Sequence, residues 1–98
     1  RTFENTARFS LDVCAVGNTK QLSHLPLIVD PSHAAGHFTL VPSLAKAAIA
    51  AGADGLIIEV HPNPQAALVD GLQSLNFSNF QRLMPVLKQV AQSVDRSI

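Results

Sequence analysis

Short apolar runs separated by polar clusters dominate the middle of this chain. Leu-Pro-Leu-Ile-Val occupies residues 25–29 and ends at Asp30, and Gly-Leu-Ile-Ile-Glu-Val occupies residues 55–60. Continuous apolar runs of this length, bounded by polar residues, are typical of strands that are buried on both faces, as in parallel sheets. We therefore predict two buried strands, at residues 25–30 and 55–60.

Between these strands the pattern changes to that of a helix. The small and polar residues 31–37 predict a loop. Over residues 39–51 apolar residues recur at steps of three and four, Pro42 lies in the first turn, and Gly52 follows as a stop signal. The predicted apolar stripe consists of Leu40, Leu44, Ala47, Ala48 and Ala51. Strand, loop, helix and strand in this order predict a βαβ unit with parallel strands.

The flanking segments are also predicted to be helical. Residues 13–23 form a weak helical pattern that Gly17 and Asn18 interrupt. Residues 77–94 form a stronger one, with Ser78 as the predicted N-cap and Pro85 as a predicted kink. Its apolar stripe comprises Phe80, Leu83, Leu87, Val90 and Val94.

This order of elements is an incomplete α/β architecture. Two parallel strands on their own leave an open edge on each side, and their apolar runs imply further neighbours. The pattern therefore favours a segment of an α/β barrel or of a doubly wound sheet over a free-standing domain. Because no repeat or linker divides residues 1–98, we expect one continuous unit.

Composition and charge limit the classes of protein. The 98 residues are 47% hydrophobic and 14% charged, and seven Lys and Arg balance seven Asp and Glu. Such a chain is not a disordered tail, and it has no electrostatic footprint for nucleic acid or an anionic membrane. No apolar run approaches the roughly 18 residues that span a bilayer. The single cysteine, Cys14, predicts a reducing compartment, so we expect a cytoplasmic protein with Cys14 as a small buried apolar residue.

Ionisable residues follow both predicted strands, at the end where functional groups of α/β proteins collect. His33 comes after the first strand, Glu59 lies near the end of the second, and Asp70 lies in the loop beyond. Because an unpaired carboxylate is costly in the apolar context of Glu59, we expect a metal ion, a Lys or Arg, or a histidine to meet it. One imidazole and two carboxylates suit a divalent ion such as Mn²⁺, Fe²⁺, Co²⁺ or Zn²⁺.

Each of these three residues also has a purely structural interpretation. His33 fits a satisfied loop residue, Glu59 a member of a structural ion pair, and Asp70 an ordinary turn residue before glycine. His61, which follows the second strand, is interpreted as a loop residue. The pattern alone therefore predicts a metal site without defining a reaction.

Four motifs follow one another along the chain. They are Leu-Pro-Leu-Ile-Val-Asp-Pro-Ser-His at 25–33, Ala-Ala-Ile-Ala-Ala-Gly-Ala-Asp-Gly at 47–55, Glu-Val-His-Pro at 59–62 and Ala-Leu-Val-Asp-Gly at 67–71. In this order they resemble the C-terminal part of 3-deoxy-7-phosphoheptulonate (DAHP) synthases, in the subfamily close to 3-deoxy-octulosonate-8-phosphate (KDO8P) synthases. Arg1-Thr-Phe-Glu resembles the segment after the sixth strand of that family, and Gln73-Ser-Leu favours DAHP synthase over KDO8P synthase.

The resemblance implies a (β/α)₈ TIM barrel of which this chain is about the last quarter, with strands seven and eight. It implies condensation of phosphoenolpyruvate with erythrose 4-phosphate to DAHP and phosphate, the entry to the shikimate pathway of aromatic amino acid biosynthesis. It further implies a divalent metal ion held by His33, Glu59 and Asp70 together with a cysteine outside this chain, and Arg1 near the substrate phosphates. The expected partners are the N-terminal part of the barrel and further copies of the protein, and the chain alone is expected to be inactive.

The sequence departs from the family pattern at two places. His37 and Phe38 stand where many relatives carry basic residues, and Val69 stands where relatives commonly have serine. Two alternatives remain open beside DAHP synthase. One is a fragment of a KDO8P synthase, and the other is a non-catalytic α/β module that oligomerises through its open strand edges.

Overall fold

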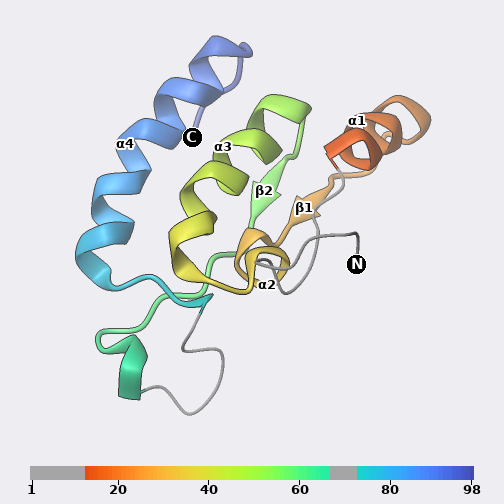
Figure 1. Cartoon of the computed structure of the whole chain (residues 1–98). Helices are drawn as coiled ribbons and strands as arrows, with labels where there is room; N and C mark the ends of the chain where they lie inside the picture. Colours follow the sequence, from red (N-terminus) through yellow and green to blue (C-terminus); the bar gives the residue numbers. More distant parts are fainter. Residues whose placement is uncertain (1–12, 67–72) are drawn as a thin grey trace.

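The chain forms a two-stranded parallel sheet with helices packed against it, in a computed structural model that describes residues 13–66 and 73–98 (Figure 1). Strands β1 (Ile28–Val29) and β2 (Gly55–Leu56) pair with Ile28 opposite Gly55 and Val29 opposite Leu56. The Ile57 N–H extends this pairing by donating to the Val29 carbonyl at 2.9 Å. The predicted parallel pair is confirmed, although the regular strands are shorter than the predicted ranges.

The crossover between the strands is helical. A short 3₁₀ turn, η1 (Phe38–Leu40), leads into α3 (Val41–Ala51). Pro42 lies in the first turn of α3, and Gly52 ends the helix with a positive φ of 113°, a conformation that favours glycine. Both predicted signals at the helix ends are confirmed.

The buried face of α3 agrees with the predicted stripe only in part. The structure buries Val41, Ala45, Ala48 and Ile49. Of the predicted stripe, Ala48 is among these buried residues, and Leu44 and Ala51 are partly buried and pack against the core. Leu40 lies in the 3₁₀ turn, and the buried row begins one residue later, at Val41. Alanines at the centre of this face leave room for the neighbouring helices, of which α1 (Val13–Leu22) and α4 (Phe77–Ser93) both contact α3.

Two predictions about local structure were wrong. Helix α1 is continuous, because a glycine in a helix interior costs only about 1 kcal/mol and Gly17 has no positive φ. The segment predicted as a loop contains the short helix α2 (Pro31–Ala35), which ends at Gly36 in the left-handed conformation. A five-residue helix is too short to show a helical period in the sequence.

Helix α4 follows the prediction more closely. It begins after Asn76, whose Oδ1 accepts the Asn79 N–H at 2.7 Å, so Asn76 is the N-cap rather than the predicted Ser78. The helix continues past Pro85 to Ser93. Its predicted apolar stripe is confirmed, with Leu83 and Leu87 buried and Phe80, Val90 and Val94 packed against the same core.

The core lies between the helices and one face of the sheet. Val29 is buried there and Leu56 packs against the same cluster, whereas Ile28 and Ile57 have the opposite strand parity and are each 52% exposed. The prediction that both strands are buried on both faces is therefore wrong for the part of the chain that the structure describes. Cys14 is exposed as well, contrary to the prediction, because α1 buries only Val16.

None of the helices in the described ranges combines the length and the apolar character that a transmembrane span requires. The 3₁₀ turn η2 (Pro64–Ala66) lies beyond β2, on the side to which both strands point (Figure 1).

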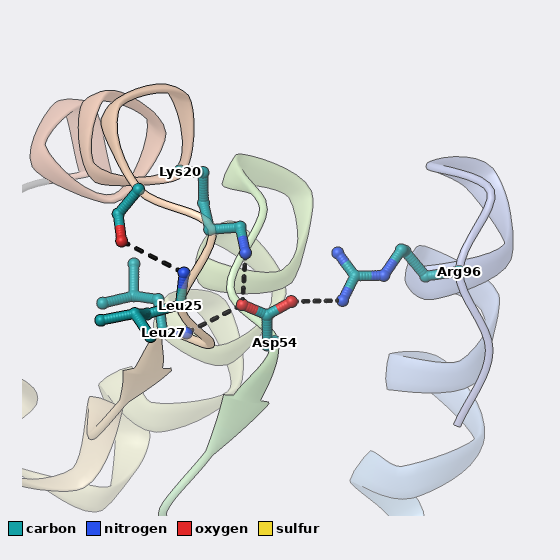
Figure 2. Close-up of polar contacts among 6 residues, drawn as sticks. Lys20, Leu25, Leu27, Asp54 and Arg96 are labelled. Atoms are coloured by element: carbon teal, nitrogen blue, oxygen red, sulfur yellow. Dashed lines mark hydrogen bonds and ion pairs between the residues drawn. The ribbon is translucent and has the colours of Figure 1, made fainter.

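An ion-pair cluster at the opposite end of the sheet ties distant segments together. Figure 2 shows Asp54, which directly precedes β2, between Lys20 of α1 and Arg96 of the C-terminal segment. The Asp54 carboxylate lies 2.6 Å from Lys20 Nζ and 2.8 Å from Arg96 Nη2, and it accepts the Leu27 N–H at 2.8 Å. These three donors, with Lys20 contributing most, hold the pKa of Asp54 well below its usual value of 3.8.

This cluster predicts an acid-sensitive contribution to stability. Because the pKa of Asp54 is lower in the folded state, its contribution is complete above about pH 4 and is lost as the pH falls through the folded-state pKa. We expect Asp54→Asn to lower the free energy of unfolding at pH 7. As the pH falls, we expect the free energies of unfolding of the variant and of the unaltered protein to converge. Urea denaturation at pH 7 and pH 3 measures the difference, and an equal difference at both pH values would contradict the assignment.

Candidate functional site

The turn after β1 brings a carboxylate to the imidazole of His33. Asp30 is the N-cap of α2: its Oδ1 accepts the His33 backbone N–H at 3.0 Å. Its other oxygen, Oδ2, makes a close contact with His33 Nδ1. The one carboxylate therefore engages both the backbone and the ring of His33. The His33 side chain is 47% exposed, so it lies at the surface of the described part of the chain.

A buried hydroxyl joins this turn to the next strand. Ser32 is completely buried, and its Oγ accepts the Glu59 N–H at 2.9 Å. On the other side, the Leu75 N–H donates to the Glu59 carbonyl at 2.9 Å, and Val60 and Leu75 form a parallel bridge. The backbone at Glu59 is thus held between the turn after β1 and the segment that leads into α4.

The structure brings two of the predicted site residues to neighbouring strand ends. His33 lies in the turn after β1, and Glu59 lies three residues beyond β2, bonded through its backbone to the residue before His33. Glu59 is half-buried, and in the described ranges its carboxylate has no hydrogen bond or ion pair. Asp70 and Arg1 lie outside the described residues. Among residues 13–66 and 73–98, no group of three His, Cys, Asp or Glu side chains is close enough to hold a metal ion.

Sequence reasoning missed two residues of this site, Asp30 and Ser32. A signal for Asp30 was present, since an acidic residue followed by proline is a recognised helix start and His33 then falls at the position whose N–H an N-cap accepts. Ser32 has no local signal, because its partner lies 27 positions away.

Two of the other histidines have local structural partners. His61 Nδ1 accepts the Asn63 N–H at 2.9 Å, which agrees with the interpretation of His61 as a loop residue. His37 caps η1 and stacks on the ring of Phe38, with 4.8 Å between the ring centroids. His24 is exposed before β1. Among the four histidines, His33 is the one that directly follows Ser32, whose hydroxyl accepts the Glu59 backbone N–H.

Parallel strands with helices packed on one face and ionisable groups after their carboxyl ends define an α/β protein with its functional edge on that side. The chain belongs to the DAHP synthetase I family, whose model matches residues 1–96.

Two relatives with known names agree with this assignment. Phospho-2-dehydro-3-deoxyheptonate aldolase of Thermotoga maritima is 50% identical over 94 residues, which cover 96% of this chain and 28% of the relative. The 2-dehydro-3-deoxyphosphooctonate aldolase of Desulfosudis oleivorans is 36% identical over 94 residues, which cover 85% of this chain and 34% of the relative. The chain thus spans about a third or less of these two relatives.

Solved structures are similar over nearly the whole chain. The crystal structure of the Thermotoga maritima phospho-2-dehydro-3-deoxyheptonate aldolase (DAHP synthase) matches with a TM-score of 0.94 at 48% identity, covering 99% of this chain and 28% of that one. A truncated form of the same synthase gives the same TM-score and identity and is covered to 37%. The arrangement of helices and strands described above is therefore that of one part of a larger α/β protein.

Proposed function

We propose that this chain is the C-terminal quarter of a (β/α)₈ barrel. Residues 1–98 are then one part of a single barrel domain, and the complete protein is a cytoplasmic DAHP synthase. The observation that carries the proposal is the match of 99% of the chain, at 48% identity and a TM-score of 0.94, to a DAHP synthase. In this proposal β1 and β2 are strands seven and eight of the barrel. The remaining strands and further copies of the protein are its partners, and the chain alone is inactive.

The exposed face of the sheet supports the barrel. Ile28 and Ile57 are apolar but exposed on the face away from the helices. Gly55 lies close to Ile28: a Cβ on Gly55 would be 2.7 Å from Ile28 Cδ1. Alternating large and small side chains are typical of a barrel interior, where layers of side chains from neighbouring strands interlock. Further strands would bury this face.

The side of β2 that does not face β1 supports the same proposal. A cavity of about 510 Å³ lies there, lined by Leu56 and Ile58 from the strand side and by Phe80, Met84 and Leu87 from α4. We propose that its occupant is a parallel, apolar strand of the N-terminal part of the barrel, since this chain covers only 28% of the Thermotoga maritima relative and the rest of that relative's length lies outside the match. In addition, the buried Gln73 Nε2 has no hydrogen-bond partner among residues 13–66 and 73–98, which is typical of a group that pairs with a neighbour outside these residues.

The residues present fit a divalent metal ion. An imidazole whose Nδ1 contacts a carboxylate is the arrangement that commonly supports a metal-bound histidine. The half-buried Glu59 carboxylate, without a hydrogen bond in the described ranges, has oxygen atoms available as ligands. We propose that His33, Glu59 and Asp70 hold an ion such as Mn²⁺, Fe²⁺, Co²⁺ or Zn²⁺, together with a ligand from the rest of the barrel.

The proposed reaction joins phosphoenolpyruvate to the aldehyde of erythrose 4-phosphate and, with uptake of water, releases phosphate. When bound, the metal ion supplies Lewis acidity at the aldehyde oxygen. The chain's own contribution is to hold the ligands: Asp30 orients His33, and Ser32 fixes the backbone of Glu59. Arg1 is proposed to bind substrate phosphate, for which a guanidinium offers two parallel donors.

Metal titration of the complete protein tests this site. We expect His33→Ala, Glu59→Ala and Asp70→Ala each to lower the affinity for Mn²⁺ at least about tenfold, since loss of groups that only support ligands already has such effects. His24→Ala is the matched control, because His24 is exposed before β1, at the opposite end of that strand. Unchanged affinity in all three variants would refute the ligand assignment.

The choice of sugar phosphate separates DAHP synthase from its alternatives. The 36% identity to a 2-dehydro-3-deoxyphosphooctonate aldolase keeps KDO8P synthesis as a second candidate. We expect the complete protein to consume phosphoenolpyruvate with erythrose 4-phosphate and not with arabinose 5-phosphate. Preference for the five-carbon substrate would favour KDO8P synthase. No turnover with either, together with self-assembly through β1 and β2, would favour the non-catalytic module.

A further inference from the structure

Asp30 makes more contacts than a helix cap requires. An N-cap side chain needs one oxygen, which accepts a backbone N–H of the first turn. Asp30 uses Oδ1 for this bond with the His33 N–H, at 3.0 Å, and also places Oδ2 against Nδ1 of the His33 ring. The second contact is not explained by capping.

We propose that Asp30 is a positioning residue that holds the His33 imidazole in the tautomer with the proton on Nδ1, so that Nε2 carries the lone pair for the metal ion. An ionised carboxylate can only accept hydrogen bonds, so the ring nitrogen beside it has to be the donor. The other ring nitrogen is then the basic one, and a metal ion binds to the nitrogen without the proton. This inference rests on the proposed function, in which His33 is a metal ligand.

The surroundings of Asp30 restrict its movement. The His33 backbone N–H donates to Oδ1, and the His33 ring contacts Oδ2. The carboxylate is therefore fixed at two points. Pro31 is buried and restricts the backbone φ between the cap and the ring. Ser32 is buried and bonded to the Glu59 backbone, which fixes the turn against the second strand end. The ring is therefore oriented relative to Glu59 by side chains of a single turn.

The substitution Asp30→Asn separates the capping role from the positioning role. Asparagine is as good an N-cap as aspartate, so the helix start is preserved. Because the His33 backbone N–H can only donate, it selects the amide oxygen and turns the amide NH₂ toward Nδ1. A donor at that place favours the opposite tautomer, with the proton on Nε2 and no lone pair for the metal ion. Asp30→Asn thus replaces the hydrogen-bond acceptor beside Nδ1 by a donor, while the shape of the side chain stays nearly the same.

Three measurements on the complete protein test the proposal: Mn²⁺ titration, urea denaturation and ¹⁵N chemical shifts. Titration with Mn²⁺ alone is expected to show an affinity about 10–100-fold lower for Asp30→Asn than for the unaltered protein, with an unchanged midpoint of urea denaturation. The ¹⁵N chemical shifts of His33 in the metal-free protein are expected to report the proton on Nδ1 in the unaltered protein and on Nε2 in Asp30→Asn. Asp30→Ser, which keeps a cap but is too short to reach the ring as well, is expected to lower the Mn²⁺ affinity while the helix start is retained.

The outcomes distinguish this inference from the proposed function. If His33→Ala loses Mn²⁺ affinity but Asp30→Asn and Asp30→Ser bind as the unaltered protein does, Asp30 is a cap only and the inference is overturned, while the metal site stands. An unchanged His33 tautomer in Asp30→Asn overturns it as well. If the unaltered complete protein binds no Mn²⁺, the proposed function fails, and the metal role of Asp30 fails with it.

Discussion

Replacing Leu87 with alanine is expected to lower the free energy of unfolding by about 2–5 kcal/mol. Leu87 is 1% exposed and belongs to the core between α3, α4 and the segment at Leu75. Its removal takes apolar surface out of the core and leaves a cavity that the rigid neighbouring helices fill only in part. Urea denaturation of the complete protein measures the loss as a shift of the midpoint.

Leu22→Ala is the matched control for Leu87→Ala, because it makes the same chemical change at a helical residue that is 87% exposed. We expect its effect to stay within about 0.5 kcal/mol, as is usual for surface substitutions. Equal losses at the two positions would contradict the packing of α4 against α3 described here.

Replacing Ser32 with alanine is expected to cost about 1–3 kcal/mol, because it leaves the Glu59 N–H without its acceptor in a part-buried position. The loss of this bond also frees the Glu59 backbone from the turn that carries His33. We therefore expect Ser32→Ala to weaken Mn²⁺ binding in addition to lowering stability. Urea denaturation and Mn²⁺ titration of the same preparation measure the two effects.

Ser43→Ala serves as the control for Ser32→Ala. Ser43 lies on the exposed side of α3, where alanine is a better helix former than serine, so we expect no loss of stability and no change in Mn²⁺ affinity. If Ser32→Ala lowers stability but leaves Mn²⁺ affinity intact, the hydroxyl supports the fold and not the position of Glu59.

The sequence predicted the elements that have a strong local signal. The parallel strands follow from uninterrupted apolar runs, and both ends of α3 follow from Pro42 and Gly52, whose backbone preferences are intrinsic. The apolar stripe of α4 was predicted because it repeats over five positions. The buried face of α3 was predicted only in part, since many residues of this helix are small and apolar on every side, and only the neighbouring helices select the row that is buried.

The candidate site was also predicted from the sequence only in part. His33 was predicted from its place after the first apolar run and Glu59 from its place near the end of the second, and the structure brings them to neighbouring strand ends. The predictions for Asp70 and Arg1 stay predictions, because both residues lie outside the described ranges. The family assignment also came from the motifs, and the match over residues 1–96 confirms it.

The sequence alone thus determined that two parallel strands end in ionisable side chains, because strand burial and helix punctuation depend on residues close together in the chain. Only the tertiary structure decided how those ends are joined. Ser32 meets Glu59 across 27 positions, and Asp54 meets Arg96 across 42, and such contacts depend on how helices and strands pack. The tertiary structure also leaves Ile28 and Ile57 exposed, because burial depends on which neighbours are present and not on the apolar character of a residue alone.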